Sequence, residues 1–298
     1  MPSPGWLSVQ KIKKMIPRPL YPLAKSTYDT VLNNIYAIKL FSLKLKIKSQ
    51  YSKSFKFDIH PEDEMYRYIH EAKGMVPNQA RMRYFSIGKE VLEDLENILK
   101  EVKFSVTSKK RILEFASGYG KVTRFLVSHY EPKSITVSDI SQEAVDFNIQ
   151  TFQTNGFFSV SNPKDLDHNN KYDLIIVISL FSHLPQKSCE AWLCKLYDLL
   201  EKNGLLIFTT HGMSILESLP TEMRQNDVVQ VADGFYYREA NETFGRLHPK
   251  EYGTTYISER YIRHIIDVHC LGRLRAFFQR GMSSYQDTYV IQKHATTE

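Results

Sequence analysis

The stretch RILEFASGYGKVTRFL, residues 111–126, decides how the rest of the chain is interpreted. It begins with a short apolar run that carries one acid, Glu114, and then breaks into the small residues Ala116, Ser117, Gly118 and Gly120. Beyond them, apolar residues resume at helical spacing. The pattern predicts a buried strand, a tight glycine turn and a helix. Because glycines allow close backbone approach and a helix start offers unpaired N–H groups, we expect a nucleotide-like ligand at this turn.

The spacing of the glycines separates two kinds of nucleotide-binding turn. A dinucleotide fingerprint is G-x-G-x-x-G, but the third position after Gly118 and Gly120 is Thr123, whose branched side chain opposes close helix packing. The order E-F-A-S-G-Y-G resembles instead motif I of the class I S-adenosylmethionine-dependent methyltransferases, written E/D-x-G-x-G-x-G, with Ala116 replacing the first glycine. The resemblance implies S-adenosyl-L-methionine as the cofactor, held by Glu114, Ala116, Gly118 and Gly120.

A second strand and helix are predicted in SITVSDISQEAVDFNIQTF, residues 134–152. Ile135 and Val137 alternate as in a strand that Asp139 ends, and Ser141 suits a helix cap. Asp139 lies about 20 residues beyond the glycines, the spacing at which a carboxylate reaches ribose hydroxyls. We therefore expect Asp139 and the following Ile140 to contact the cofactor. The alternative is that the carboxylate only caps the helix.

The turn after the third strand supplies two candidates for the adenine amino group. FFSVSNPKDL, residues 157–166, predicts a strand and a loop. In the family that the chain resembles, this turn presents a polar side chain to the adenine, and its D-x-x-x-L arrangement matches N-P-K-D-L on Asn162. Asp165 is the competing residue, and either side chain would also suit a simple turn.

The most apolar run, KYDLIIVISLFSHLP at residues 171–185, predicts a central strand covered on both faces. It resembles motif IV of the same family, whose strand end lies beside the methyl donor, so Ser179 is expected at the cofactor. His183 is then a candidate general base for a substrate hydroxyl, since histidine exchanges protons near neutrality. His211, which follows the predicted fifth strand, is the second candidate. The alternative for His183 is that it only supports the loop.

The C-terminal part predicts a helix from Pro185 that ends at Asn203-Gly204, a fifth strand in LLIFTTHG, a helix in SERYIRHIIDVHC, and two strands, LRAFFQR and DTYVIQK. A terminal pair of strands joined by a turn matches the methyltransferase sheet, in which the last strand is antiparallel. Regular signals fade from Met213 to about Tyr256. Because a long insert on the ligand side is usually functional, we expect it to contact the acceptor. The expected contacts are Tyr236, Tyr237, His248 and Tyr252.

Two helical regions are predicted before the glycine turn, from about Ser26 to Lys48 and from about Pro61 to Lys100, with a break between Gly74 and Pro77. In the family that the chain resembles, helices before the first strand form a lid over the cofactor. Arg81 and Tyr84 are therefore predicted cofactor contacts. The alternative is a partly buried tyrosine and a solvated arginine.

The net charge of +6 is unevenly distributed. Met1 to Phe57 carries eleven Lys and Arg against one acid, Asp29, which gives +10, and the remaining 28 basic and 32 acidic residues give −4. A basic amphipathic helix in this arm suits an anionic membrane, an acidic partner or nucleic acid. The alternative is that its apolar side packs on the catalytic domain while its lysines face water.

The composition predicts a protein with a substantial core and no membrane span. Apolar residues make up 42% and aromatic residues 12%, unlike a disordered chain. The three cysteines include no C-x-x-C pair, which favours reduced thiols and a cytoplasmic location. The N-terminal apolar residues are interrupted by lysines and prolines, so we expect neither a signal peptide nor a transmembrane helix. We expect no metal site, because acids and histidines lack local ligand spacing.

We predict an α/β fold: a Rossmann-like, seven-stranded methyltransferase sheet with an N-terminal helical extension and a lid insert after strand 5. The predicted parts are a basic arm at 1–57, a helical lid region at 58–110 and a core at 111–298 with the insert at 213–256. The predicted activity is metal-independent O-methylation of a small molecule, such as a sugar, glycan or secondary metabolite. The alternatives are an N-methyltransferase, an RNA methyltransferase that uses the basic arm, and a cofactor-binding scaffold without turnover. The sequence predicts no oligomeric state.

Overall fold

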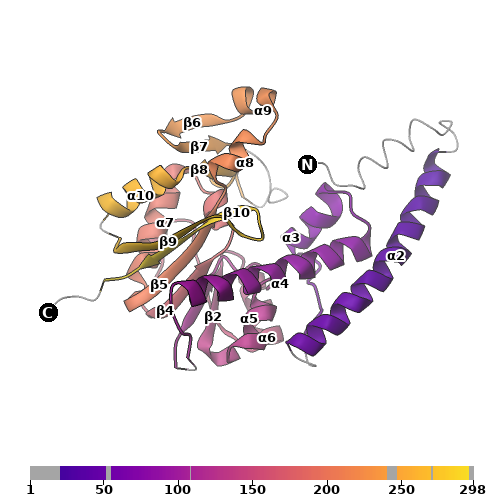
Figure 1. Ribbon diagram of the computed structural model, residues 1–298, viewed down its shortest axis with the longest axis horizontal. Helices are drawn as coiled ribbons and strands as arrows, with labels where there is room; N and C mark the ends of the chain where they lie inside the picture. The colour runs from indigo at the N-terminus through magenta and orange to yellow at the C-terminus, as the bar shows by residue number, and fades with distance from the viewer. Residues whose placement is uncertain (1–20, 52–54, 108, 240–246, 270, 295–298) are drawn as a thin grey trace. The chain divides into compact units, whose positions relative to one another are not determined.

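The computed structural model describes residues 21–51, 55–107, 109–239, 247–269 and 271–294 (Figure 1). The chain forms two compact units, residues 1–89 and 90–298. The predicted parts that begin at residues 58 and 111 stay predictions. Parts of the predicted arm and insert, at residues 1–20, 52–54 and 240–246, lie outside the described residues.

The first unit is helical, as the apolar periodicity predicts. It contains α2 (Tyr21–Gln50), α3 (Glu64–Arg67), a π-helical turn η2 (Tyr68–Ala72) and the first half of α4 (Pro77–Glu101). Asp63 caps α3 by accepting a hydrogen bond from the Tyr66 backbone N–H. The predicted break before Pro77 is confirmed, and Gly74 lies in it with a left-handed φ of 62°.

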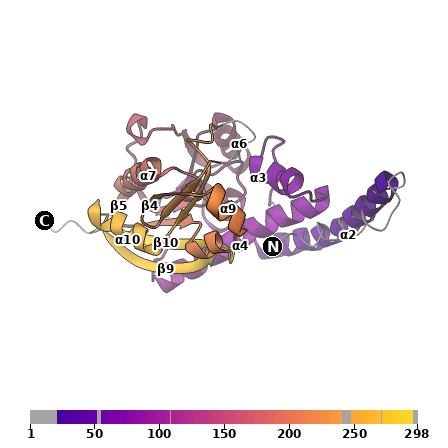
Figure 2. The same ribbon diagram turned by 90° about the horizontal axis from the view of Figure 1, so that it is seen from above.

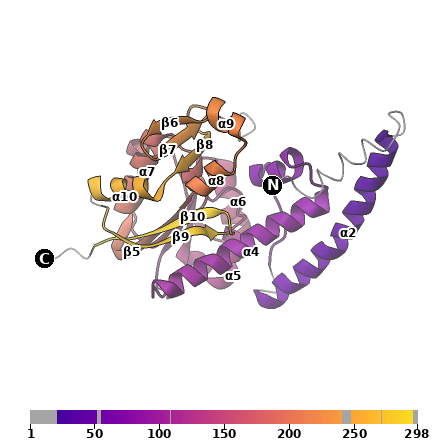
Figure 3. The same cartoon turned by 45° about the horizontal axis from the view of Figure 1, so that its top comes forward.

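The second unit contains a seven-stranded sheet of order β3-β2-β1-β4-β5-β10-β9. The strands pair in parallel from β3 to β5, and β10 is antiparallel to both β5 and β9. Figure 3 shows the β9–β10 pair beside β5. The predicted seven-stranded sheet with an antiparallel last strand is therefore confirmed. The strands are β1 (Ile112–Phe115), β2 (Ile135–Asp139), β3 (Asn155–Phe158), β4 (Tyr172–Val177), β5 (Leu200–Thr210), β9 (Arg273–Met282) and β10 (Gln286–Gln292).

Helices and 3-10 turns connect these strands. Helices α7 and α10 contribute to one hydrophobic cluster with β1, β4, β5 and β10, while α5 and α6 contact each other and β2. Figure 2 shows α10 beside β9, with which it is in contact. The connecting elements are α5 (Thr123–His129), η3 (Pro132–Ser134), α6 (Gln142–Phe152), η4 (Pro163–Asp165), η5 (Leu180–Ser182), α7 (Gln186–Asp198) and α10 (Glu259–Val268).

The insert after β5 is more regular than the sequence indicates. It contains α8 (Met213–Glu217), α9 (Thr221–Asn226) and an antiparallel sheet of order β6-β7-β8 (Figure 1). Its strands are β6 (Val229–Ala232), β7 (Phe235–Arg238) and β8 (Thr254–Ile257). They escaped prediction because each strand has only four residues, and because β8 is entirely buried and does not alternate apolar with polar residues.

The predicted end of α7 at Asn203-Gly204 is wrong. The helix ends at Asp198, and both residues lie within β5. Asn203 has a left-handed φ of 62°, which asparagine tolerates well. It lies where β5 is irregular, because Tyr172 pairs with Leu200 but Leu174 pairs with Leu205. The Asn-Gly signal therefore marks a bulge in a strand and not a helix cap.

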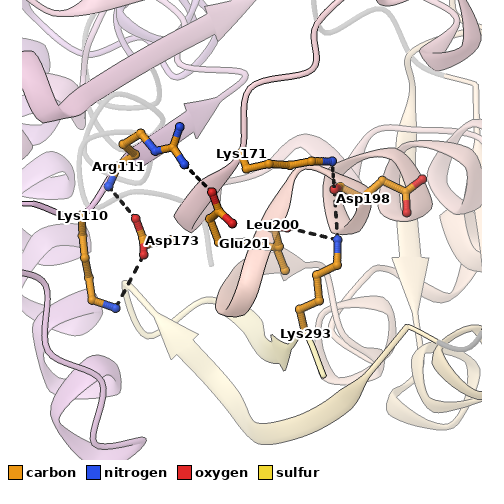
Figure 4. Close-up of polar contacts among 8 residues, drawn as sticks. All are labelled: Lys110, Arg111, Lys171, Asp173, Asp198, Leu200, Glu201 and Lys293. Carbon is orange, nitrogen blue, oxygen red and sulfur yellow. Dashed lines mark hydrogen bonds and ion pairs between the residues drawn. The ribbon is translucent and has the colours of Figure 1, made fainter. Parts of the chain in front are cut away.

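Charged side chains join the amino ends of the strands (Figure 4). The Arg111 backbone N–H donates to Asp173 Oδ2 at 2.8 Å, and the Arg111 guanidinium pairs with Glu201. Lys293, which follows β10, donates from Nζ to the carbonyls of Tyr197, Asp198 and Leu200 at 3.0–3.2 Å. A cation at the last carbonyls of α7 stabilises the end of that helix.

Candidate active site

The glycine turn after β1 is tied directly to the end of β2. The Gly118 backbone N–H donates to Asp139 Oδ2 at 2.8 Å, and Asn148 Nδ2 donates to the Gly118 carbonyl at 2.7 Å. Ala116, Gly118 and Gly120 have φ values of 59°, 53° and 78°. Ala116 thus occupies the left-handed region that the motif's first glycine would occupy, at a cost of about 1 kcal/mol.

The two glycines of the turn have different structural roles. A Cβ added at Gly120 would lie 2.4 Å from Asn148 Oδ1 and 2.5 Å from Phe152 Cε2, so a side chain there would displace α6. A Cβ added at Gly118 would meet nothing within 4 Å. Space is therefore open on the Gly118 side of the turn, where a ligand can approach the backbone.

Arg124 supports this turn, and the sequence did not identify it. Its side chain is 1% exposed, and its Nε donates to the Gly120 carbonyl at 2.8 Å. The guanidinium also lies 5.3 Å from the centre of the Phe152 ring. A spacing of four residues between Gly120 and Arg124 was the available signal, because that spacing brings a helical side chain over the preceding turn.

Glu114 and Thr123 form a buried pair beneath the turn. Thr123 Oγ1 donates to Glu114 Oε2 at 2.6 Å, and their exposed fractions are 0% and 3%. Burial raises the pKa of the Glu114 carboxyl to about 8. Thr123 stands where a dinucleotide fingerprint has its third glycine. It is thus the hydrogen-bond partner of Glu114, the acid of motif I. Direct contact between Glu114 and the cofactor stays a prediction.

Asp139 ends β2 with both carboxylate oxygens oriented by the backbone. Oδ2 accepts from the Gly118 N–H, and Oδ1 accepts from the Ser141 N–H at 3.0 Å. Burial raises the pKa of this carboxyl. Each oxygen has further lone-pair capacity, so the carboxylate can also accept from vicinal hydroxyls. Ile140 beside it is 37% exposed and offers an apolar contact at the same strand end.

Asn162 and Asp165, the two candidates for the adenine amino group, lie together on η4. Asn162 Nδ2 donates to Asp165 Oδ2 at 3.1 Å, and Asn162 Oδ1 accepts from the Lys164 N–H at 3.2 Å. Both side chains are exposed. Each keeps acceptor capacity for an amino group, and the choice between them stays a prediction.

Ser179 lies in a polar network that joins β4, β5 and β10. Its N–H donates to Thr209 Oγ1 at 2.8 Å, and its Oγ donates to Gln286 Oε1 at 3.0 Å. Gln286 Nε2 in turn donates to Ser182 Oγ at 3.1 Å. The network holds Ser179 at a left-handed φ of 68°. Thr209 and Gln286 are buried positioning residues that sequence reasoning missed, because nothing local marks partners 30 and 107 residues away.

His183 is oriented by the insert. Its Nδ1 lies 2.8 Å from the Gly253 carbonyl, and the Gly253 N–H donates to the His183 carbonyl at 2.9 Å. Because a carbonyl oxygen only accepts, Nδ1 of His183 carries the proton of this bond. The ring of Tyr252 stacks on His183 with centroids 4.7 Å apart and planes 9° apart.

His211 joins the same cluster from the end of β5. Its ring centroid is 6.0 Å from that of His183, 5.7 Å from Tyr256 and 5.5 Å from Tyr285. Only 9% of its surface is exposed, whereas His183 is half-buried. The structure therefore brings the two predicted bases together at the carboxyl ends of β4 and β5.

The four predicted acceptor contacts have different surroundings. Tyr252 stacks on His183, whereas Tyr237 Oη donates to the Pro249 carbonyl at 2.7 Å, and burial raises the pKa of Tyr237 to about 12. Tyr236 packs on the small apolar cluster around Tyr256. The exposed His248 accepts the Lys250 N–H on Nδ1 at 3.1 Å. Their contact with an acceptor stays a prediction.

The two predicted lid residues, Tyr84 and Arg81, lie in the first unit and differ in burial. Tyr84 is fully buried and donates from Oη to Asp63 Oδ2 at 2.6 Å, while Arg81 is exposed. Their contact with the cofactor stays a prediction. Among the described residues, no group of three or more His, Cys, Asp and Glu side chains is arranged to hold a metal ion, and no helix is long and apolar enough to cross a membrane.

The second unit thus gathers an open glycine turn, a backbone-oriented carboxylate and a histidine bonded to a backbone carbonyl at one edge of the sheet. Parallel strands place their carboxyl ends at the same edge, and ligands of open α/β sheets bind there. The open side of the glycine turn allows a nucleoside ligand to approach the backbone closely, and the carboxylate of Asp139 can accept hydrogen bonds from its sugar hydroxyls. The histidine is suited to accept a proton from a second molecule.

A family model matches part of the second unit. Residues 113–206, which are 94 of the 298, match the family model described as a methyltransferase domain. No curated protein matches the chain.

Solved structures of low sequence identity also align with the chain. An S-adenosylmethionine-dependent methyltransferase from Clostridium acetobutylicum is 13% identical, with 70% of this chain and 92% of that chain covered and a TM-score of 0.49. The 1,6-didemethyltoxoflavin-N1-methyltransferase of Burkholderia thailandensis is 10% identical, with 78% and 87% covered and a TM-score of 0.48. The magnesium protoporphyrin IX methyltransferase of Synechocystis is 15% identical, with 71% and 86% covered and a TM-score of 0.46.

Proposed function

From the premise that this chain carries a methyltransferase domain of the class I, S-adenosylmethionine-dependent family, we propose that it methylates a hydroxyl group of a small molecule, such as a sugar, a glycan or a secondary metabolite. The observation that carries the proposal is the bond between His183 Nδ1 and the Gly253 carbonyl. The bond assigns a proton to Nδ1, so Nε2 is the ring nitrogen that would accept the proton that a hydroxyl loses during methyl transfer.

The residues after β1 and β2 fit the nucleoside part of the donor. S-adenosylmethionine supplies a methyl group activated by its positively charged sulfur. Asp139 would accept hydrogen bonds from the ribose hydroxyls, Ile140 would pack on the adenine, and Asn162 or Asp165 would accept from its amino group. The open side of Gly118 lets the backbone approach the ligand without a side chain between them.

The residues after β4 and β5 fit the acceptor. His183 Nε2 would take the proton of the acceptor hydroxyl, and the Gly253 carbonyl would stabilise the imidazolium that results. The stacked ring of Tyr252 restrains the imidazole, and His211 is the second candidate for the proton. Because positioning alone accounts for much of methyl transfer, the base matters most for an acceptor that stays protonated near neutrality.

A screen with isotopically labelled donor tests the proposal. The full chain is incubated with labelled S-adenosylmethionine and separate sets of hydroxylated metabolites, glycans, amines and RNA, and the products are identified by mass analysis. We expect label on oxygen in a small molecule or glycan. Label only on nitrogen, or only in RNA, would contradict the proposal. Donor binding without label in any set would favour the scaffold alternative.

A further inference from the structure

Helix α2 carries a row of apolar side chains that are exposed in the part of the chain that the structure describes. We call Leu23, Val31, Ile35, Ile38, Phe41 and Leu45 the outer row; their exposed fractions are 70%, 53%, 46%, 74%, 63% and 53%. The last five follow one another at intervals of three or four residues, which places them along one side of a helix. They are half of the twelve large apolar side chains that are exposed in the described residues, so exposure is concentrated on this helix.

A different face of α2 already packs within the first unit. Leu40 and Ile47 are buried there, and Asn33 Oδ1 accepts the Asn78 N–H at 2.9 Å. Leu32, Tyr36 and Leu43 lie on the same face by their spacing and are half-buried. The outer row therefore lies apart from the face through which α2 packs on the described residues of this unit. Six exposed apolar side chains on one helix indicate an interaction surface.

Lysines border the outer row on both sides. Lys39 and Lys46, seven residues apart, follow one edge of the row, and Lys44 and Lys48, four residues apart, follow the other. The arm from Met1 to Phe57 carries +10. We propose that the outer row of α2 docks on an anionic lipid surface: the apolar side chains enter the boundary between headgroups and acyl chains, and the lysines meet lipid phosphates.

The same charge argues against a second copy of this chain as the occupant. Two helices that faced each other through their outer rows would bring two arms of +10 together, and like charges at short distance repel. Nucleic acid fits less well than lipid, because the centre of the row is aliphatic. Single strands bind basic grooves through aromatic stacking, which Val31, Ile35 and Ile38 do not provide.

Co-sedimentation of the full chain with lipid vesicles tests the proposal. We expect the protein to bind vesicles that contain phosphatidylglycerol and not vesicles of phosphatidylcholine alone. The double variant Ile38→Glu, Phe41→Glu should lose at least about tenfold in vesicle affinity, because two carboxylates enter the apolar contact. The variant Lys39→Glu, Lys46→Glu should lose a similar factor, since each lysine near an anionic surface contributes about fivefold. Raising the salt concentration should weaken binding as well.

A matched control separates the outer row from apolar exposure in general. Val229→Glu, Val231→Glu replaces two side chains of β6 that are 62% and 49% exposed, with the same change in charge, and should keep the vesicle affinity. Three results would overturn the proposal: no binding to either vesicle, equal loss in the control variant, or a lipid-free dimer that Ile38→Glu, Phe41→Glu dissociates. Equal circular dichroism spectra for all variants exclude unfolding as the cause.

Discussion

The carboxyl ends and the amino ends of the parallel strands differ in the contacts that their polar groups make. At the carboxyl ends, Ala116 and Ser179 hold left-handed backbone angles of 59° and 68° directly after β1 and β4. The amino ends carry exposed ion pairs, such as Arg111 with Glu201, and a lysine on helix carbonyls (Figure 4). Strained backbone costs about 1–3 kcal/mol per residue and persists where the surroundings impose it. The carboxyl ends thus carry the buried polar network around Ser179, where we propose that a ligand binds, and the amino ends carry surface ion pairs.

The acidic residues named at the two ends differ in their burial. Burial raises the pKa values of Glu114 and Asp139 at the carboxyl ends, where both side chains lie beside the glycine turn. At the amino ends, Glu201 and Arg111 are 39% and 52% exposed in a surface ion pair. Surface pairs contribute about 0–1 kcal/mol, whereas desolvated groups respond strongly to a neighbouring charge. The same kind of substitution should therefore change turnover or donor affinity at the carboxyl ends and the free energy of unfolding at the amino ends.

The largest effect is expected for His183→Gln. Loss of a positioned general base lowers the rate by about 100- to 10,000-fold, and we expect that loss in kcat with the acceptor found in the labelled-donor screen. Donor affinity should stay within twofold, since we propose that His183 contacts the acceptor and not the donor. Tyr252→Phe is the matched control, because a phenyl ring keeps the stack on His183. Full activity in both His183→Gln and His211→Gln would refute histidine as the base.

The next effect is expected for Asp139→Asn. The amide oxygen can still accept the Gly118 N–H, but the charge that strengthens bonds from ribose hydroxyls is lost. We expect donor affinity to fall about 10- to 100-fold, measured by calorimetry with S-adenosylhomocysteine. Asp173→Asn makes the same chemical change at the amino ends and should leave that affinity unchanged. Equal losses in the two variants would show that the two ends do not differ.

A pH effect is expected from Glu114. Its pKa in the folded protein is about 8 against an ordinary value of 4.5, so between these values the folded state keeps a proton that the unfolded state releases. Stability from this group is complete at low pH and is lost as pH rises toward 8, with a slope of up to ~1.4 kcal/mol per pH unit. In Glu114→Gln the slope should be flatter in urea unfolding followed from pH 5 to 8. Parallel curves for the two proteins would refute the assignment.

Local patterns predicted the parallel half of the sheet and the elements around the glycine turn. Strand and helix periods, the Ser141 cap and the spacing of Asp139 from the glycines depend on neighbours in sequence, and all lie where expected. The same is true of Asn162 and Asp165, which share one turn. Their predictability comes from short-range physics: hydrophobic period, capping and turn chemistry.

Contacts between distant residues were not predictable. The carbonyl that orients His183 belongs to Gly253, 70 residues away, and Gln286 reaches Ser179 across 107 residues. The local sequence around these residues does not predict the two contacts, because they depend on how the insert folds back and how β10 enters the sheet. The predicted site therefore contained the candidate reacting side chains but lacked most groups that position them.

The smallest effect is expected for Lys293→Met, at the amino ends. The variant removes three bonds to the carbonyls of Tyr197, Asp198 and Leu200 but keeps an unbranched apolar side chain. A partly exposed cation at a helix end contributes about 1 kcal/mol, and we expect that loss in urea unfolding with an unchanged m-value. Lys171→Met, which loses a single bond to Asp198, should lose less. Donor affinity should be the same in both variants, and a tenfold drop in Lys293→Met would mean that strand β10 transmits changes at the amino ends to the Ser179 network.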